Sequence, residues 1–216
     1  CIKFNHFDEY EHLAEIDNGA SETLFSQLER EISSDKVSDY YVELLVSGLE
    51  MVHRCSSKFV KVSVRSVGSD RALRLLCEVV EKYLLFPHYH AHAPTIICFV
   101  AKLFNHFTKA SSIKQKMTTD NRIISSMARV LKSDMEDSVK IEAIKLLSNL
   151  VYCCSIAIHA EGIIDSLVES VHSPNTSIKE ASVRTFLNLA ISMENRQILG
   201  WRNDTISVLL TCLSIE

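Results

Sequence analysis

Two stretches near the C-terminal end of the chain, Ser138-Val-Lys-Ile-Glu-Ala-Ile-Lys-Leu-Leu-Ser-Asn149-Leu-Val and Ser177-Ile-Lys-Glu-Ala-Ser-Val-Arg-Thr-Phe-Leu-Asn188-Leu-Ala, repeat the same pattern. They align without a gap, and 39 residues separate Asn149 from Asn188. Self-similarity at about 40 residues is typical of helical solenoids, in which each repeat closes the apolar core of its neighbour. The pair therefore predicts an all-α solenoid.

The apolar residues of both stretches fall on one side of a helix. Counted from each asparagine, apolar or small residues stand at −10, −6, −3, −2 and +1, which is the spacing of a buried stripe on a helix of about four turns. The small residue at −6, Ala143 or Ser182, lets a neighbouring helix approach closely. The other residues expected to face inward are Val139, Leu146, Leu147, Leu150, Ile178, Thr185, Phe186 and Leu189.

Helix boundaries can be predicted around these stretches. Shorter apolar helices are expected at 123–131 and 163–171 and, truncated, at 206–213, and each is expected to pair with the long helix after it. Ser177 and Glu180 read as a capping box that starts the second long helix after Pro174. Asn175 and Asn203 match glycosylation sequons, but both lie where a helix start needs a cap, so we expect capping.

Weaker copies lie upstream. Asn105 stands in the key place of the stretch 99–107, although the bulky Phe99 occupies position −6. A diverged copy at 48–52 has Met51 in place of the asparagine. Before it, a helix is expected at 21–32, with an apolar stripe of Leu24, Phe25, Leu28 and Ile32.

The stretch Ala157-Ile-His-Ala-Glu-Gly162-Ile-Ile-Asp-Ser-Leu-Val168, followed by 177–190 and Glu194-Asn-Arg-Gln-Ile198, resembles the armadillo repeat. That family has a short helix, a glycine-marked turn, a second helix ending in Leu-Val, and a long third helix ending in Asn-Leu-Ala. The resemblance is good over 112–216, fair over 70–111 and weak before residue 55. HEAT repeats are the close alternative, and the three aligned asparagines favour armadillo. The resemblance implies a right-handed α-α superhelix.

On this basis the chain divides into an acidic leader with a capping helix and one continuous domain of repeats. The chain starts at Cys1 without a methionine and stops within a repeat, so we expect a fragment of a longer protein. The predicted segments are 1–38 for the leader and capping helix, 39–69 for a diverged repeat, 70–111, 112–151 and 152–190 for three repeats, and 191–216 for a partial repeat.

Composition agrees with a helical solenoid. Hydrophobic residues make up 47% of the chain, and only 5 Gly and 3 Pro interrupt it. The sequence contains no run of about 18 apolar residues, the length that is needed to span a bilayer. The 7 cysteines show no paired spacing, which favours free thiols in a reducing compartment. We therefore expect a cytoplasmic protein, with the nucleus left open.

Charge is unevenly distributed. Residues 1–50 hold 12 acids and 3 bases, whereas the remainder holds 15 acids and 20 bases, for a net charge of −4. The favoured interpretation of the acidic leader is a solvated cap of the first helices. The alternative is that the leader folds onto a basic groove of its own chain.

The resemblance also implies a function. Third helices of armadillo proteins line a groove, where a ladder of asparagines hydrogen-bonds the backbone of an extended peptide. The resemblance implies this role for Asn105, Asn149 and Asn188. An amide supplies both a donor and an acceptor, as a peptide group does. The alternative is that each amide only bonds the adjacent repeat.

Nuclear-import receptors of the family carry tryptophan four residues before the asparagine, where this chain has Ala101, Lys145 and Arg184. Cations there would repel basic signals and favour acidic or phosphorylated segments, as in the catenin-like branch. Together with Lys145 and Arg184, the residues Lys140 and Lys179 are expected to form a ridge of cations that binds such segments. The predicted peptide-binding residues are Asn105, Lys145, Asn149, Arg184 and Asn188.

Other functions have less support in the sequence. His88, His90 and His92 alternate in one loop and could converge on a metal ion, but a polar loop is the favoured interpretation. No catalytic motif is present, so we expect no enzyme, cofactor or metal. A modest basic cluster between Lys58 and Arg74 makes RNA a lesser alternative, against which the acidic net charge counts. The expected partner is a protein or peptide bound to a monomer; the main alternative is a structural spacer.

Overall fold

The computed structural model describes residues 22–23, 25–26, 28–30, 32, 43, 46–50, 70–85, 91–151 and 160–213. The predicted all-α fold is confirmed, and no strand occurs among these described residues. The helices with complete bounds are α4 (Asp70–Leu85), α5 (Ala93–Phe107), α6 (Ser111–Thr119), α7 (Asn121–Lys132), α8 (Asp137–Val151), α9 (Ala160–Val171), α10 (Thr176–Leu189), α11 (Met193–Gly200) and α12 (Asn203–Leu213).

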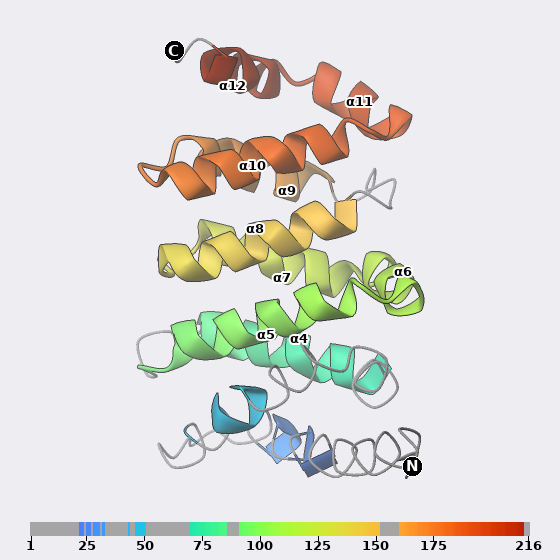
Figure 1. The fold of residues 1–216 in the computed structure, drawn as a ribbon, viewed down its shortest axis with the longest axis vertical. Helices are drawn as coiled ribbons and strands as arrows, with labels where there is room; N and C mark the ends of the chain where they lie inside the picture. The colour runs from blue at the N-terminus through green and yellow to red at the C-terminus, as the bar shows by residue number, and fades with distance from the viewer. Residues whose placement is uncertain are drawn as a thin grey trace, which may run out of the picture.

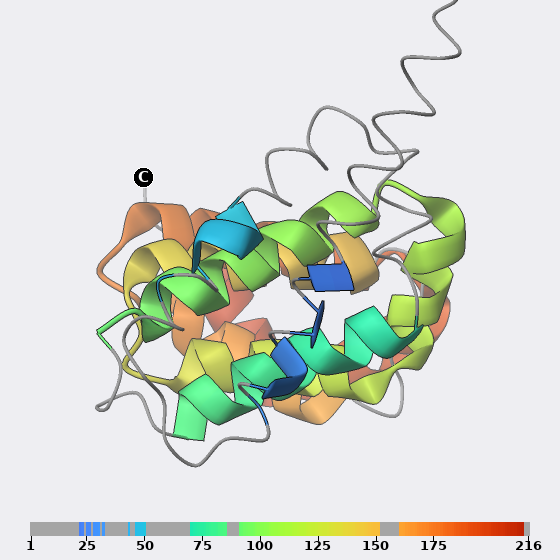
Figure 2. The ribbon, with the colours of Figure 1, turned by 90° about the horizontal axis from the view of Figure 1, so that it is seen from below.

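The helices stack in two layers along the longest axis of the molecule (Figure 1). α5, α8 and α10 form one layer, and α4, α7 and α9 form the other, as the view along the stack also shows (Figure 2). α8 packs on α5, α7 and α10, while α9 packs on α7, α10 and α12. Each repeat thus covers the core of the next one, which is how a solenoid is stabilised.

The apolar stripe predicted for the two long helices is buried. In α8 and α10 the residues at −10, −6, −3, −2 and +1 from the asparagine are at most 2% exposed. Two of them carry hydroxyls that bond within α10, because Ser182 Oγ donates to the carbonyl of Ile178 and Thr185 Oγ1 to that of Ala181, both at 2.8 Å. Their burial therefore leaves no hydroxyl hydrogen unbonded.

The register predicted for α5 from Asn105 is wrong by one residue. Counted from Asn105, position −10 is the exposed Thr95 and −6 is the half-buried Phe99. Counted from His106, the five stripe positions are all buried, and they hold Ile96, Val100, Leu103, Phe104 and Phe107. Because one residue turns an α-helix by about 100°, the apolar stripe fixes its rotation. His106 therefore takes the place of Asn149 and Asn188, and Asn105 that of Ser148.

Helix starts differ in part from the sequence prediction. The capping box at Ser177 is wrong, because the N-cap of α10 is Asn175, whose Oδ1 accepts a hydrogen bond from the Ser177 N–H at 2.9 Å. Asn203 is the first residue of α12 rather than its cap, since α12 begins there. Gly162, expected at a turn, lies inside the first turn of α9.

Several predictions fall on other parts of the chain. Residues 1–20 of the predicted acidic leader and the loop residues His88 and His90 lie outside the described residues. In the predicted helix 21–32 every described residue is helical, and Phe25 and Leu28 are buried. The repeat boundaries stay predictions. Among the described helices, none is long and apolar enough to cross a membrane.

Candidate functional site

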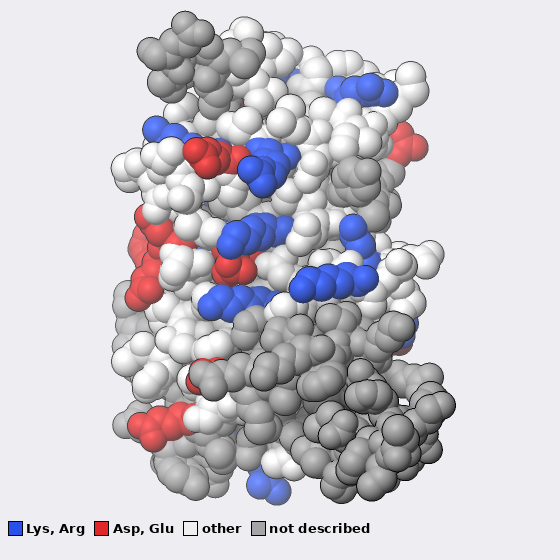
Figure 3. All heavy atoms as spheres, viewed as in Figure 1, with Lys and Arg blue, Asp and Glu red and all other residues white. Residues whose placement is uncertain are grey.

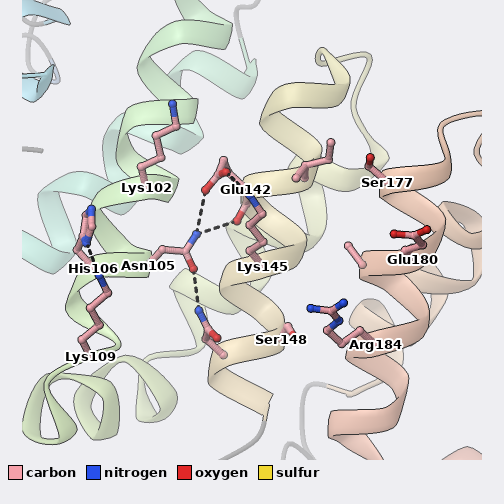
Figure 4. A pocket seen from close by; sticks show the side chains of 13 residues that line it. Lys102, Asn105, His106, Lys109, Glu142, Lys145, Ser148, Ser177, Glu180 and Arg184 are labelled. Atoms are coloured by element: carbon pink, nitrogen blue, oxygen red, sulfur yellow. Dashed lines mark hydrogen bonds and ion pairs between the residues drawn. The ribbon is translucent and has the colours of Figure 1, made fainter. Parts of the chain in front are cut away.

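α5, α8 and α10 border a groove of about 740 Å³ (Figure 4). Four of the five predicted peptide-binding residues, Asn105, Lys145, Asn149 and Arg184, line it, and Asn188 does not. The other lining residues come from the same three helices and are Lys102, His106, Lys109, Ile141, Glu142, Ser148, Ser177, Glu180 and Ala181.

The asparagine amides connect successive repeats. Asn149 Nδ2 donates to Asn105 Oδ1 at 3.1 Å, and Asn105 Nδ2 donates to the backbone carbonyl of Glu142 at 3.1 Å. Asn188 Nδ2 donates to both the carbonyl and the hydroxyl of Ser148, at 3.2 and 2.8 Å. Figure 4 shows the bonds that join Asn105 on α5 to α8 as dashed lines. These bonds join α5 to α8 and α8 to α10.

The three amides differ in what remains for a ligand. Asn188 uses both of its N–H groups on Ser148, so only its Oδ1 could accept a further bond. Asn149 is exposed, spends one N–H on Asn105, and makes no other bond with a described residue. Asn149 is therefore the amide that can offer a donor and an acceptor together.

Cations outnumber acids in the groove. Lys102, Lys109, Lys145 and Arg184 line it, against Glu142 and Glu180. Lysine and arginine side chains gather across the middle of this face, with acidic side chains among them (Figure 3). Lys145 Nζ pairs with Glu142 Oε1 at 2.8 Å, whereas Arg184 makes no hydrogen bond or ion pair with any residue that the structure describes. The groove can therefore attract an anion.

No family model matches the sequence, and no curated protein matches it. Among solved structures the chain is similar to a designed armadillo repeat protein in complex with a (KR)4 peptide, with a TM-score of 0.51 and 12% sequence identity. The similarity covers 89% of this chain and 91% of that chain. The chain has an armadillo-like repeat fold. The resemblance predicted from the Asn-Leu-Ala pattern is confirmed at the level of the fold.

In this armadillo-like solenoid one cation recurs in each long helix. The cation stands four residues before the reference position of each helix, which is His106 in α5, Asn149 in α8 and Asn188 in α10. These cations are Lys102, Lys145 and Arg184. All three line the groove, whereas Ala101, which the sequence predicted there, is fully buried. Counting from the buried stripe of α5 instead of from Asn105 would have found Lys102. Lys140 and Lys179, also predicted for this ridge, lie outside the groove lining.

Proposed function

We propose that this armadillo-like solenoid binds an extended acidic peptide, or an acidic segment of a partner protein, in the groove of α5, α8 and α10. The observation that carries the proposal is the recurring cation at Lys102, Lys145 and Arg184, all of which line the groove. A row of cations on successive repeats suits a ligand that crosses the helices and carries several carboxylates or phosphates.

The five predicted residues then have separate roles. Asn149 bonds the ligand backbone with its remaining N–H and its Oδ1, while Lys145 and Arg184 bind acidic side chains. Asn105 holds the Asn149 amide in place, and Asn188 fixes α10 against α8. Side chains of an extended ligand alternate between two sides, so those on one side can meet the cations.

The ligand of the similar solved protein gives a sharp contrast. That designed protein is in complex with (KR)4, a peptide of lysine and arginine only. In this chain four cations line the groove against two acids, so a cationic peptide would be repelled and an anionic one attracted. We propose binding rather than catalysis, by a monomer in the cytoplasm or nucleus.

A peptide array tests this function. The purified chain is applied to immobilised peptides of one length whose content of Glu, phosphoserine, Lys and Arg varies independently, with (KR)4 included. Binding should rise with the number of acidic groups and be absent on (KR)4. Binding that is independent of acid content, or strongest on the cationic peptides, would contradict the proposal. An RNA oligonucleotide added as competitor should not displace the bound chain.

A spacer function is the second candidate, and one observation favours it. Large apolar side chains are exposed toward the α12 end of the stack, and several are more than half exposed, namely Leu187, Ile191, Met193, Trp201 and Leu210. Similar side chains are buried between the internal repeats. If docking at this end is the function, the asparagines serve only to join repeats, and the groove variants described below leave partner binding unchanged.

A further inference from the structure

The carboxylate of Glu142 lies in the groove and contacts both Lys145 and Asn105. Its Oε1 lies 2.8 Å from Lys145 Nζ, and its Oε2 lies 3.4 Å from Asn105 Nδ2. The side chain is only 17% exposed, so it lies in the groove rather than in the solvent. A carboxylate thus already sits between a cation and an amide donor on two successive repeats.

We propose that Lys145 and Asn105 form a carboxylate-binding subsite, which Glu142 fills in the free protein and which an acidic side chain of the ligand takes over on binding. This inference rests on the proposed function, because it specifies one anchor point of the same groove. The ligand group is a carboxylate, and the exchange replaces one carboxylate by another on the same two partners.

The donors of the subsite stay in position when the Glu142 side chain leaves. Asn105 Nδ2 also donates to the backbone carbonyl of Glu142 at 3.1 Å, and α8 holds that carbonyl in place. Asn105 Oδ1 meanwhile accepts from Asn149. The amide therefore keeps its orientation, and only the flexible side chain of Glu142 has to move.

The exchange sets a requirement on the ligand. Replacing one carboxylate by another at a half-exposed lysine gains little, because such ion pairs are weak and screened by salt. A ligand gains affinity only when a second acidic group reaches a cation that is not paired, and Arg184 on α10 is such a cation among the described residues. Peptides with one acidic residue should therefore bind poorly, and those with two or more should bind.

The variant Glu142→Gln tests the subsite, since glutamine keeps the size of the side chain and removes its charge. Glu180→Gln is the matched control, because Glu180 also lines the groove but makes no hydrogen bond or ion pair with a described residue. The probe is a fluorescein-labelled synthetic peptide of alternating glutamate and serine. We expect Glu142→Gln to bind it about three- to fivefold more tightly than the native chain, the size of one exposed ion pair. Glu180→Gln should change the affinity by less than about twofold.

An equal gain in peptide affinity in both variants would mean that the change in net charge alone causes the gain, and it would overturn the subsite. Unchanged or weaker binding by Glu142→Gln would overturn it too. When either of these results is found while the native chain binds the probe and Arg184→Glu abolishes that binding, the proposed function stands and the subsite alone is removed. If neither the native chain nor Glu142→Gln binds the probe, both proposals fail.

A second variant gives a readout that does not depend on the peptide. Glu142→Ala empties the subsite, so acetate should enter it and shift the NMR signals of the Asn105 side-chain amide. The same acetate concentration should leave those signals unchanged in the native chain, where Glu142 fills the subsite. Absence of an acetate-dependent shift in Glu142→Ala would overturn the proposal.

Discussion

Asn149 on α8 donates a hydrogen bond from Nδ2 to Oδ1 of Asn105 on α5, at 3.1 Å. Asn105 is oriented to accept it because its own Nδ2 is held by Glu142. The pair therefore joins two repeats and also decides which atoms of Asn149 face the groove. Substitutions can separate the structural role of this amide from the ligand-binding role that we propose for it.

Asn188→Ala should destabilise the fold more than Asn149→Ala. Asn188 loses two hydrogen bonds and leaves the carbonyl and hydroxyl of Ser148, a residue that is 9% exposed, without their donor. We expect a loss of about 1–3 kcal/mol in the free energy of unfolding. Asn149→Ala loses one bond at an exposed position and should cost about 0.5–1 kcal/mol. Urea denaturation followed by circular dichroism measures both, and the reverse order would contradict the assigned bonds.

Asp120 should stabilise α7 in a pH-dependent way. Its side chain caps α7 by accepting from the Arg122 N–H at 3.1 Å and also binds the guanidinium at 2.8 Å. This hydrogen bonding holds the pKa of Asp120 below its usual value of 3.8. A lowered carboxyl pKa gives stability that is present above the unfolded-state value and is lost as the pH falls through the folded-state value.

Asp120→Asn keeps an oxygen for the cap and loses the ion pair. At neutral pH it should be less stable than the native chain by up to about 1 kcal/mol, and this difference should vanish below the folded-state pKa. Asp120→Ala also loses the cap and should cost about 1 kcal/mol more at neutral pH. Urea denaturation at neutral and acid pH checks this, and a difference that persists in acid would exclude the ion pair as its cause.

Cys77 should be protected from alkylation in the native chain. It is 1% exposed on α4, and burial raises the pKa of its thiol to about 12. At pH 8 only about one thiol in ten thousand would then be ionised. Cys98 on α5 is half-buried and should react faster. Mass spectrometry after iodoacetamide treatment, with and without urea, compares the two; rapid native labelling of Cys77 would contradict its packing.

Much of the fold could be predicted because burial follows a pattern that the sequence displays. The repeat containing Asn149 and Asn188 predicted the two long helices and the buried residues of their stripe, but not the burial of Ile144 and Val151 on α8. The predicted register of α5 was wrong because it was aligned on the identity of Asn105 and not on the apolar stripe. The stripe sets how a helix rotates against its neighbours, and Asn105 is one residue off it.

The residues that line the groove could be predicted only in part. Lys145 and Arg184 were found because α8 and α10 share one register, whereas Lys102 was missed with the register of α5. The pair of Glu142 and Lys145 has a local i, i+3 spacing on α8. The contact of Glu142 with Asn105 joins two helices through residues 37 positions apart, which no local spacing reveals. The capping box at Ser177 failed because the helix begins before that residue, where Asn175 caps it by accepting from the Ser177 N–H.

The most direct test of the groove compares two double variants with the same change of charge. Lys145→Glu with Arg184→Glu alters the groove, and Lys140→Glu with Lys179→Glu alters the same two helices outside its lining. Fluorescence anisotropy measures the affinity of each for the glutamate–serine peptide, after circular dichroism has verified folding. We predict that the groove variant loses at least about tenfold in affinity while the control stays within about twofold of the native chain. Equal losses in both, or unchanged binding by the groove variant, would contradict the account.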